Sequence, residues 1–457
     1  MDLKGKRVCV IGAGKSGTGA VKLLYNVGAQ IVLYDGNDKL DRQELASKLP
    51  RECKAEIILG DFPDELIKRI DLAVISPGVP TDLPFVDRIR SRGIPLWGEL
   101  ELAFRFEKGE VLAVTGTNGK TTTTSLLGHI MKHWRDKVYI VGNIGEPYTD
   151  IVLETSENST TVAEVSSFQL ETIDTFHPIV SAILNITPDH MNRHYTMENY
   201  IRIKENITKN QDDFDLCVLN YEDKVLRAFG SSLIKKDSGP EVLFYSSERA
   251  LEHGIYLEGR NIVFDDGLSK TTVCDTGELQ IIGMHNYENV MAAVGMALQM
   301  DVPMEIIHEA LATFKAVPHR IEFSGEKHGV VYYNDSKGTN PDAAIRAIRA
   351  MNCPTYLIGG GYDKNADYTE WIKSFDGKVK KFVLIGATRE KIRDAAYAAG
   401  FHDVLLFDTF EEAFSYCAQH AVAGEAVLLS PACASWGMFD NYEQRGDRFK
   451  ELVASLD

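Results

Sequence analysis

Short apolar runs alternate with stretches of helical pattern from the first residues onward. Four such runs open the chain: Arg7–Ile11, Ile31–Asp35, Ala55–Leu59 and Leu72–Ser76. They are compact and rich in β-branched residues, and a helical stretch reaching Leu24 separates the first two, which makes a β-α-β unit. The pattern predicts a Rossmann-like α/β domain over residues 1–96.

The middle of the chain repeats this pattern and then changes. Val111–Thr124 has the pattern of a short buried strand, a glycine turn and the first turn of a helix. Between about Lys236 and Gly283 the runs become short and rich in turn residues, which indicates a β-rich annex. After the Ala-rich helix Val290–Leu298, the segment Asp301–Pro303 is typical of a boundary. We therefore expect a central domain over residues 97–302, with a parallel sheet and this annex.

The last part of the chain alternates again. Its apolar runs are Val330–Asn334, Thr355–Gly359, Lys381–Ile385, Val404–Phe407 and Ala426–Ser430, with helical patterns between them. This pattern predicts a second Rossmann-like domain over residues 303–457. The fold class expected for the whole chain is therefore α/β with three domains.

Composition narrows the class of protein. With 457 residues, 44% hydrophobic and 25% charged, the chain is long enough for three globular domains of roughly 150 residues each. A formal net charge of −17 disfavours nucleic acid or an anionic membrane as a partner. The seven cysteines are scattered without a Cys-x-x-Cys pair, and no apolar run reaches the ~18 residues of a membrane span. We expect a soluble protein of the reducing cytosol, without a disulfide framework or zinc site.

The strongest chemical motif is the glycine turn after Val111–Thr115. Gly116 and Gly119 allow backbone N–H groups to converge, Lys120 can reach outer phosphates, and Thr121 offers a hydroxyl to Mg²⁺. The spacing departs from the strict phosphate-loop pattern, because the position five residues before Gly119 is a valine. A tight strand-to-helix turn with a capping threonine is the alternative.

A second glycine motif lies at the start of the chain. Gly12–Gly17 has the form Gly-x-Gly-x-x-Gly, and Asp35 follows at the spacing of the acid that binds a ribose hydroxyl in dinucleotide-binding folds. Ser76–Gly78 ends a later strand, where ligand-binding loops of open α/β sheets lie. Alone, this motif predicts NAD binding.

Polar residues also end the central strands. Asn143, Glu164 and His190 each follow an apolar run, so the three side chains are expected at the sheet edge that carries the glycine turn of residues 116–119. A metal ion held there could touch bound phosphates. A hydrogen-bonded surface histidine is the alternative for His190.

Taken together, these motifs resemble those of the Mur ligases of peptidoglycan synthesis, and the chain is identified as a member of that family over its whole length. The matching segments are Gly116–Thr122, Glu164–Leu170, Asn185–His190, His285–Asn289, Pro318–Arg320, Asn334–Lys337, Ser430–Ser435 and Asn441–Gly446. The last domain lacks the Asp-Asn-Pro-Arg motif that is usual in the ligase for a diamino acid. Folylpolyglutamate synthetase, another relative, lacks a Rossmann-like N-terminal domain.

The resemblance implies an ATP-dependent ligase that joins an acid to a D-amino acid. ATP would phosphorylate the carboxylate of UDP-N-acetylmuramoyl-L-alanine, and the amine of D-glutamate would attack the resulting acyl phosphate to form an amide. Such a transfer between anions needs charge neutralisation and in-line positioning rather than a protein nucleophile.

The resemblance also implies roles for residues of this sequence. The expected ATP site comprises Gly116, Thr117, Asn118, Gly119, Lys120, Thr121, Thr122 and, near the adenine, Asn289 of the His285 motif. His319, Arg320 and Asp335 match groups that complete it when the domains close. Thr121 and Glu164 match ligands of a first Mg²⁺, and His190 a ligand of a second. Capping for Asn289 and a surface ion pair for Arg320 remain the alternatives.

Lys204 lies four residues after Tyr200 in the helix that follows Asp189 and His190. The family's lysine at this position is carbamylated, so a carbamate is expected here. It would offer Mg²⁺ two anionic oxygens, which an ammonium cannot. The sequence alone would place a helix lysine on the solvated surface.

The resemblance reassigns the first glycine motif from NAD to the UDP of the substrate. Its expected contacts are Gly14, Lys15, Ser16, Gly17, Asp35, Ser76, Pro77 and Gly78, with Asn143 on the substrate side. The expected D-glutamate site comprises Thr339, Lys364, Ser435 and Tyr442, with tyrosine at the last position where phenylalanine is common. For Lys364 the alternative is a solvated loop lysine.

Three alternatives to this function stay open: a Mur ligase for a different amino acid, an NAD-dependent dehydrogenase and a non-catalytic nucleotide-binding regulator. We expect catalysis by Lys120, His190 and Lys204 in a cytoplasmic monomer that neither binds nucleic acid nor inserts into a membrane.

Overall fold

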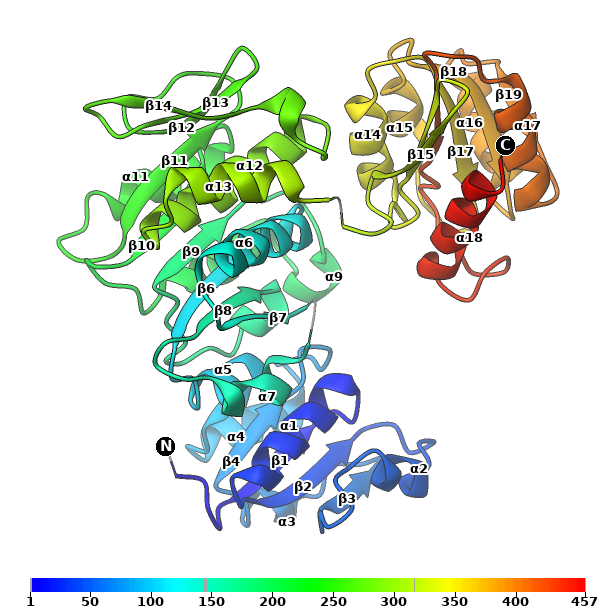
Figure 1. Cartoon of the computed structure of the whole chain (residues 1–457). Coiled ribbons are helices and arrows are strands. Elements are labelled where there is room, and N and C mark those ends of the chain that lie inside the picture. The colour runs from blue at the N-terminus through cyan, green and yellow to red at the C-terminus, as the bar shows by residue number, and fades with distance from the viewer. Residues whose placement is uncertain (1, 144–145, 316, 457) are drawn as a thin grey trace. The chain divides into compact units, whose positions relative to one another are not determined.

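The computed structural model describes residues 2–143, 146–315 and 317–456. Its strands form three sheets (Figure 1). Contacts divide the chain into two compact units. The first contains residues up to Thr276 together with Glu288–Leu311, and the second contains Gly277–Tyr287 and Ala312 onward. Each unit is described by itself.

The first sheet has five parallel strands in the order β3-β2-β1-β4-β5. The strands are β1 Arg7–Ile11, β2 Gln30–Asp35, β3 Glu56–Leu59, β4 Leu72–Ile75 and β5 Leu96–Gly98. The helices are α1 Lys15–Asn26, α2 Arg42–Ser47, α3 Asp64–Ile67, α4 Pro84–Ser91 and α5 Glu99–Phe104. This is the expected Rossmann-like arrangement.

The side chains of β1 point alternately to the two faces of the sheet, which explains why helices cover both faces. Val8 and Val10 pack with Val21 and Leu24 of α1, whereas Cys9 and Ile11 belong to a separate cluster with α3 and α4. Because successive side chains of a strand point to opposite faces, a fully apolar strand needs a helix layer on each side. Figure 1 shows α1 on one side of the sheet and α3 and α4 on the other.

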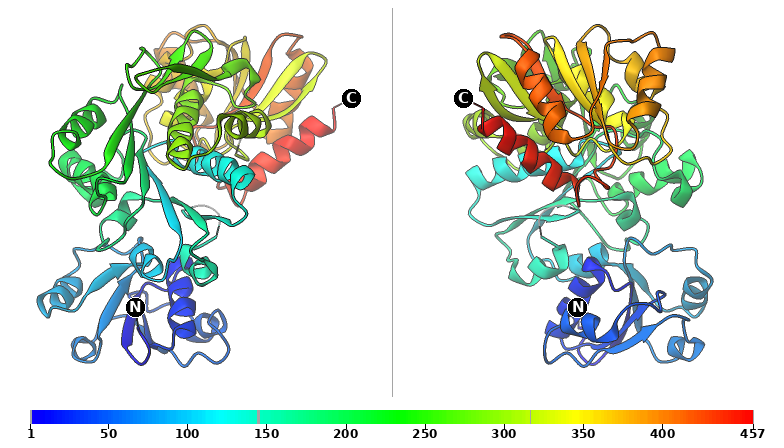
Figure 2. Two further views of the ribbon diagram at one scale, coloured as in Figure 1. Left: turned by 60° about the vertical axis from the view of Figure 1, so that its left-hand side comes forward. Right: turned by 90° about the vertical axis from the view of Figure 1, so that its right-hand side faces the viewer.

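The central sheet has nine strands in the order β14-β13-β12-β11-β10-β9-β6-β8-β7. Its strands are β6 Glu110–Thr115, β7 Val138–Gly142, β8 Thr160–Glu164, β9 Val180–Ile183, β10 Leu216–Asn220, β11 Glu241–Ser246, β12 Gly254–Glu258, β13 Asn261–Asp265 and β14 Lys270–Asp275. Pairing is parallel from β7 to β12 and antiparallel from β12 to β14. The predicted β-rich annex is thus an antiparallel extension of the central sheet (Figure 2).

The helices of the middle region lie between these strands or follow the last of them. They are α6 Lys120–Trp134, α7 Tyr148–Ile151, α8 Ser167–Leu170, α9 Met191–His194, α10 Met197–Glu205, α11 Lys224–Leu233, α12 Met284–Gln299 and α13 Met304–Thr313, with short 3₁₀ turns at Val152–Glu154, Asn206–Thr208 and Thr276–Glu278. None of the described helices has the length and apolar character that a bilayer crossing requires.

The third sheet has the order β15-β16-β20-β17-β18-β19, and only the β15–β16 pair is antiparallel. The strands are β15 Glu322–Lys327, β16 Val330–Asn334, β17 Thr355–Gly360, β18 Val379–Ile385, β19 Val404–Leu406 and β20 Ala426–Leu429. The helices are α14 Pro341–Ala350, α15 Thr369–Lys373, α16 Arg389–Ala398, α17 Phe410–His420 and α18 Tyr442–Ala454. The parallel strands leave the ends of β16, β20 and β17 at one edge.

Glu101 of α5 anchors the connection between the first and central sheets. Its carboxylate is fully buried and accepts hydrogen bonds from the backbone N–H groups of Asp174, Thr175 and Phe176, from the Thr175 hydroxyl and from Arg105. Burial alone would raise the pKa of Glu101, but these bonds lower it. The carboxylate therefore holds α5 against the segment before β9.

Replacing this carboxylate should destabilise the first unit. We expect Glu101→Ala to lower the free energy of unfolding by about 3 kcal/mol, because several buried N–H groups lose their acceptor at once. Urea denaturation followed by circular dichroism measures the change. Glu110→Ala removes a part-exposed partner of Arg135 and should cost less than about 1 kcal/mol. Equal effects of the two variants would contradict this view of Glu101.

Candidate active site

The loop between β6 and α6 has the backbone geometry of a phosphate-binding loop. Gly116 and Gly119 have φ angles of +149° and +87°, which side-chain-bearing residues rarely adopt. No described side chain caps α6, so its first N–H groups are available to an anion. The ammonium of Lys120 donates to the carbonyl oxygens of Gly116 and Thr117, both at 2.9 Å, and so lies over the loop.

Residues that follow β9 hold this loop in place. The Asn185 side chain accepts from the backbone N–H of Asn118 at 2.9 Å and donates to its carbonyl oxygen at 3.0 Å. The Thr117 hydroxyl lies 3.2 Å from the Tyr200 hydroxyl and 3.1 Å from the Thr187 carbonyl oxygen. The loop shape is therefore fixed by the fold.

The other expected ATP residues of the first unit lie around the start of α6. Thr121 and Thr122 are buried in its first turn. Asn289 accepts a hydrogen bond from Thr123 at 3.2 Å. A Cβ atom at Gly119 would lie only 2.3 Å from the Asn289 side-chain oxygen, so Asn289 packs directly on the loop.

Glu164 is a buried carboxylate with half of its hydrogen-bonding capacity unused. It ends β8 opposite Val114 of β6, and its Oε1 atom accepts from Asn143 at 3.0 Å. Its Oε2 atom is buried and has no hydrogen-bond partner among the residues that the structure describes. A buried anionic oxygen next to a phosphate loop fits a divalent cation, so the donor set suits Mg²⁺.

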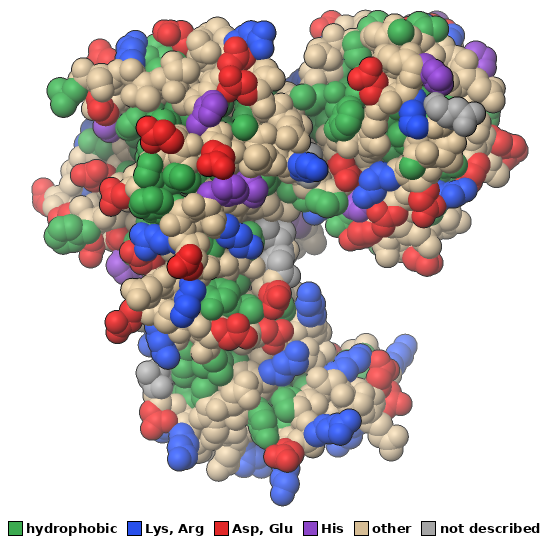
Figure 3. All heavy atoms as spheres, viewed as in Figure 1, with side chains coloured by type: hydrophobic (Ala, Val, Ile, Leu, Met, Phe, Trp, Pro, Cys, Tyr) green, Lys and Arg blue, Asp and Glu red, His purple; other side chains and the backbone are tan. Residues whose placement is uncertain are grey.

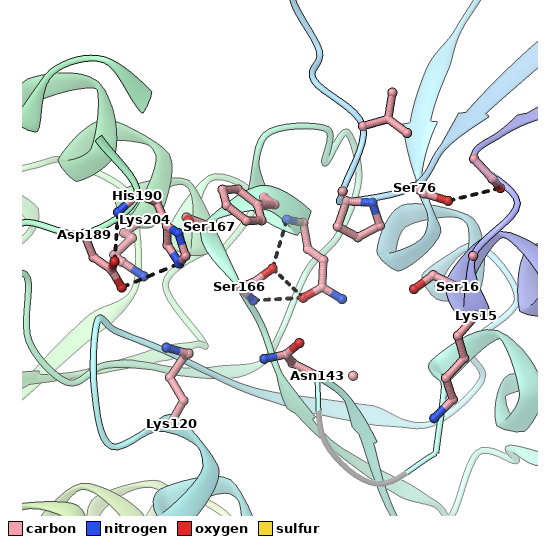
Figure 4. Close-up of a pocket in the computed structure, with 18 of the residues that line it drawn as sticks. Lys15, Ser16, Ser76, Lys120, Asn143, Ser166, Ser167, Asp189, His190 and Lys204 are labelled. Atoms are coloured by element: carbon pink, nitrogen blue, oxygen red, sulfur yellow. Dashed lines mark hydrogen bonds and ion pairs between the residues drawn. The ribbon is translucent and has the colours of Figure 1, made fainter. Parts of the chain in front are cut away.

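His190 lies at the turn into α9 with a left-handed φ of +54°. Its ring is half-exposed, with Nε2 3.5 Å from an Asp189 carboxylate oxygen and its centroid 4.9 Å from that of Phe168. It lines the same cavity as Lys120 and is accessible to a ligand there. Figure 4 shows His190, Asp189 and Lys204 on one side of that cavity.

Lys204 is buried, so the surface position that its helix alone would suggest is wrong. Its side chain is 1% exposed, and Nζ donates to the Gly116 carbonyl oxygen at 2.7 Å and lies 4.9 Å from the centre of the Tyr200 ring. Burial, with the nearby charge of Lys120, holds the pKa of Lys204 well below its usual value. A neutral amine is thus favoured directly beneath the phosphate loop.

One cavity of about 540 Å³ joins this region to the first sheet. In Figure 4, Lys120, His190 and Lys204 lie toward one end, Lys15, Ser16 and Ser76 toward the other, and Asn143 and Ser166 between them. The predicted residues that line it are Gly14, Lys15, Ser16, Asp35, Ser76, Pro77, Gly78, Lys120, Asn143, His190 and Lys204. Gly17 is buried behind the Gly12 turn instead.

The first-sheet end of the cavity has a dinucleotide-type turn. A Cβ atom at Gly17 would lie 1.9 Å from the Gly12 carbonyl oxygen, which explains the glycine. Asp35 accepts from the backbone N–H of Ala13 at 2.8 Å and so also supports the turn. No described side chain caps α1, which leaves its first N–H groups for an anion.

A second cavity of about 600 Å³ lies beyond Asp35. Tyr34, Phe62, Phe85 and Arg88 line it, and the Phe62 and Phe85 rings are stacked with their centroids 4.6 Å apart. No sequence motif marks these aromatic residues, because they come from three separate segments. Such a surface fits a planar base.

Charge distinguishes the first sheet from the rest of the chain. Residues 1–96 contain 15 Lys and Arg against 13 Asp and Glu, a balance of +2, whereas the whole chain carries −17. Figure 3 shows Lys and Arg side chains frequent over this part, at the bottom of the view. The balance favours an anionic ligand at this end.

The remaining predicted residues lie in the second unit. Thr339, Lys364 and Ser435 follow β16, β17 and β20, which are neighbours in the third sheet, so the three loops share one edge. Nζ of Lys364 lies 5.2 Å from the centre of the Trp436 ring. Tyr442 begins α18, and its ring lies 6.0 Å from that of His319.

Asp335 and Arg445 are buried charged groups at this edge. Asp335 accepts from the Ser430 hydroxyl at 2.7 Å, and burial raises the pKa of this carboxyl to about 7 despite that bond and the charge of Arg320. Arg445 donates to the side chain and backbone of Ser336 and to the Cys433 carbonyl oxygen. It ties two of the three loops together.

His285 belongs to the same unit. It is partly exposed, and desolvation with the charges of Arg346 and Arg320 lowers its pKa to about 4, which favours a neutral ring.

Some residues of the first-unit cavity were given no role by sequence reasoning. Ser166, Phe168 and Gln169 line it directly after β8, and Asp189 and Tyr200 line it near His190. A role for the first three could have been predicted, because they belong to the Glu164–Leu170 segment and follow a strand end. A role for Tyr200 could not, since its contact with Thr117 joins residues 83 apart in sequence.

Three family models match consecutive parts of the chain. The N-terminal domain model of MurD-like Mur ligases matches residues 6–98, the Mur ligase middle domain matches residues 114–297, and the glutamate ligase domain of Mur ligases matches residues 319–433.

Similar proteins agree with these matches. A protein of Lachnoclostridium phytofermentans named UDP-N-acetylmuramoylalanine--D-glutamate ligase is 56% identical over 100% of this chain and 99% of its own length. One of the same name from Lachnospira eligens is 55% identical over 100% of both chains. The structure of the MurF ligase of Thermotoga maritima in complex with ADP is similar in fold, with a TM-score of 0.59, 17% identity and coverage of 99% of this chain and 95% of that one.

The unpaired oxygen of Glu164 should contribute to the binding of ATP with Mg²⁺. We expect Glu164→Gln to weaken Mg²⁺-dependent ATP binding by about tenfold or more, because the amide removes the anionic charge that a divalent cation needs. Isothermal titration with and without Mg²⁺ measures the change. Glu110→Gln is the control, because Glu110 begins β6 and so lies at the end of that strand away from the phosphate loop. This variant should bind ATP as the parent does. Unchanged Mg²⁺-dependent binding in Glu164→Gln would rule out a cation at this carboxylate.

Proposed function

Because this chain belongs to the Mur ligase family, we infer that it is the ligase that adds D-glutamate to UDP-N-acetylmuramoyl-L-alanine with hydrolysis of ATP, in the synthesis of peptidoglycan. Relatives of that name are up to 56% identical over the full chain. The geometric observation that carries the proposal is the single cavity that joins the first glycine turn to Lys120, His190 and Lys204. An NAD-dependent dehydrogenase would not need a phosphate-loop lysine such as Lys120 at the other end of the cavity that holds its dinucleotide.

The proposed division of substrates follows the three sheets. Residues 1–96 bind the UDP-sugar, with its diphosphate at the Gly12–Gly17 turn, residues 97–302 bind ATP, and residues 303–457 bind the amino acid. The positive balance of the first segment and the aromatic cavity beyond Asp35 support the first assignment. We also propose that the protein acts as a monomer in the cytoplasm.

The chemistry proposed for the central site is phosphoryl transfer followed by acyl transfer. The substrate carboxylate lies in the cavity, Lys120 binds the outer phosphates of ATP, and the loop N–H groups hold them in line with that carboxylate. The resulting acyl phosphate loses phosphate when the D-glutamate amine attacks its carbonyl carbon. Lys120 neutralises charge that develops on the transferred group.

Two magnesium sites fit the residues present. Thr121 and Glu164 would hold the first, and His190 with a carbamate on Lys204 the second. Bound Mg²⁺ would supply positive charge to the phosphate oxygens.

The whole reaction can be tested by phosphate release. ATP is supplied with UDP-N-acetylmuramate or its L-alanyl derivative and with L-alanine, D-alanine, L-glutamate or D-glutamate. We expect phosphate release only with the L-alanyl derivative and D-glutamate. Release with another amino acid would assign a different Mur-type activity, and oxidation of NADH without phosphate release would favour a dehydrogenase.

Carbamylation of Lys204 rests on its burial and lowered pKa. The neutral amine attacks CO₂, an N–C bond forms and one proton leaves, which gives a carbamate. We expect a protein prepared with ¹³C-bicarbonate to show a carbamate carbon signal by NMR that Lys204→Arg lacks and that acidification removes. The same signal in Lys204→Arg, or no carbamate signal in the parent, would exclude the modification.

D-glutamate recognition is assigned to Lys364, Thr339, Ser435 and Tyr442. We expect Lys364→Ala to raise the KM for D-glutamate about 10- to 100-fold, because it removes a charge-assisted hydrogen bond to a carboxylate, and to leave the KM for ATP nearly unchanged. Lys391→Ala, which removes an exposed lysine paired with Asp363, serves as control. An unchanged D-glutamate KM in Lys364→Ala would remove this assignment.

A further inference from the structure

Glu99 is a buried acid at the substrate end of the cavity to which no role has been given above. It is the first residue of α5 and is 7% exposed. Its Oε1 atom accepts a hydrogen bond from the Ser76 hydroxyl at 2.8 Å. It lines a small side cavity of about 200 Å³, whose walls also include Lys15, Ser16 and Asn143 of the main cavity.

Ser76 connects this acid to the Gly12–Gly17 turn. A Cβ atom at Gly12 would lie 2.8 Å from the Ser76 hydroxyl oxygen, and one at Gly17 would lie 3.2 Å from it. Figure 4 shows Ser76 and Ser16 at the same end of the main cavity. The Glu99 carboxyl is therefore one hydroxyl group away from the turn that holds the diphosphate in the proposed function.

The charges around Glu99 do not neutralise it. Lys15 lines the same small cavity, but none of the ion pairs recorded for the described residues includes Glu99. The polar groups of the neighbouring helix α7 have other partners: Tyr148 donates a hydrogen bond to Glu107, and Asp150 forms an ion pair with Lys22 of α1 at 3.7 Å.

The next acidic residue of α5 also has other hydrogen-bond partners. Glu101 is bound by Arg105 and by the backbone of residues 174–176. Burial raises the pKa of Glu99 to about 7, against the opposing effect of hydrogen bonds from Ser76 and Ser16.

An ionised Glu99 would oppose substrate binding. A diphosphate carries two negative charges, and a third charge close to it in a site of low dielectric is repelled strongly. A carboxylic acid has the opposite effect, because its O–H can donate toward a phosphate oxygen while its carbonyl oxygen still accepts from Ser76.

We propose that Glu99 is a binding residue for the sugar-nucleotide diphosphate and acts in its protonated form, so that the UDP-substrate binds together with one proton taken from solvent onto the Glu99 carboxylate. The proposal rests on the proposed function, because it needs a diphosphate at the Gly12–Gly17 turn. Binding should weaken as pH rises through neutrality, where the free protein loses this proton and the complex retains it.

Glu99→Gln separates this role from a structural one. The amide keeps the shape of the side chain and the oxygen that accepts from Ser76, so a merely structural Glu99 would be replaced without a change in pH dependence. Glu56→Gln, a part-exposed acid of the same sheet that pairs with Arg7, is the matched control.

The experiment is titration calorimetry of UDP-N-acetylmuramoyl-L-alanine into the full chain without ATP, between pH 6.0 and 8.5. Two buffers of different ionisation enthalpy are used at each pH, since their difference gives the protons taken up. For the parent and Glu56→Gln we expect Kd to rise about 20- to 30-fold across this range, with uptake of close to one proton near pH 8. For Glu99→Gln we expect a nearly constant Kd and no uptake.

Each outcome decides one claim. A parent Kd that does not depend on pH, or a Glu99→Gln variant that keeps the parent's dependence, overturns the proposal while the proposed function stands. Absence of binding at every pH overturns the proposed function instead. If Glu99→Gln does not fold, the ¹³C NMR titration of the Glu99 carboxyl in the parent decides: a midpoint that rises with the ligand supports the proposal, and a midpoint that the ligand does not raise overturns it.

Discussion

The parallel pairing of β6 with β8 and β9 is the constraint on which the rest of the site depends. Val114 lies opposite Glu164 on one side and Ala182 on the other. All three strands therefore end at one edge, where the phosphate loop, the unused carboxylate oxygen and the segment leading to His190 follow. The chemistry of the site is thus set by backbone hydrogen bonds that involve none of its functional side chains.

Three buried ionisable groups of the first unit lie where a ligand is proposed. Glu164 has an oxygen without a recorded bond among the described residues, Lys204 is a buried amine beneath the loop, and Glu99 is a buried acid beside the diphosphate turn. Each would cost stability in an ordinary core. In contrast, Glu101 is equally buried but fully bonded, which is what a structural role requires.

The sequence predicts most of the fold, because the buried strands are compact and apolar and their periodicity is local. It also predicts the phosphate loop and the strand-end residues Asn143, Glu164 and His190, since parallel strands bring their ends to one edge. It fails where contacts are long-range. Lys204 has a helical neighbourhood typical of a surface residue, and its burial goes with bonds to Thr115 and Gly116, 89 and 88 positions away. The aromatic cavity of Tyr34, Phe62 and Phe85 was missed for the same reason. The antiparallel strand β15 pairs locally with β16, but its mixed sequence Glu-Phe-Ser-Gly-Glu-Lys contains no apolar run that would identify a strand.

Phosphate transfer at this edge to the carboxylate of the UDP-substrate should precede formation of the amide. It is tested most directly by labelling the alanyl carboxylate oxygens of UDP-N-acetylmuramoyl-L-alanine with ¹⁸O, adding ATP and D-glutamate, and measuring the label in the products by mass spectrometry. An acyl phosphate intermediate requires one labelled oxygen in each inorganic phosphate released. Phosphate without label, or label in AMP, would contradict the account.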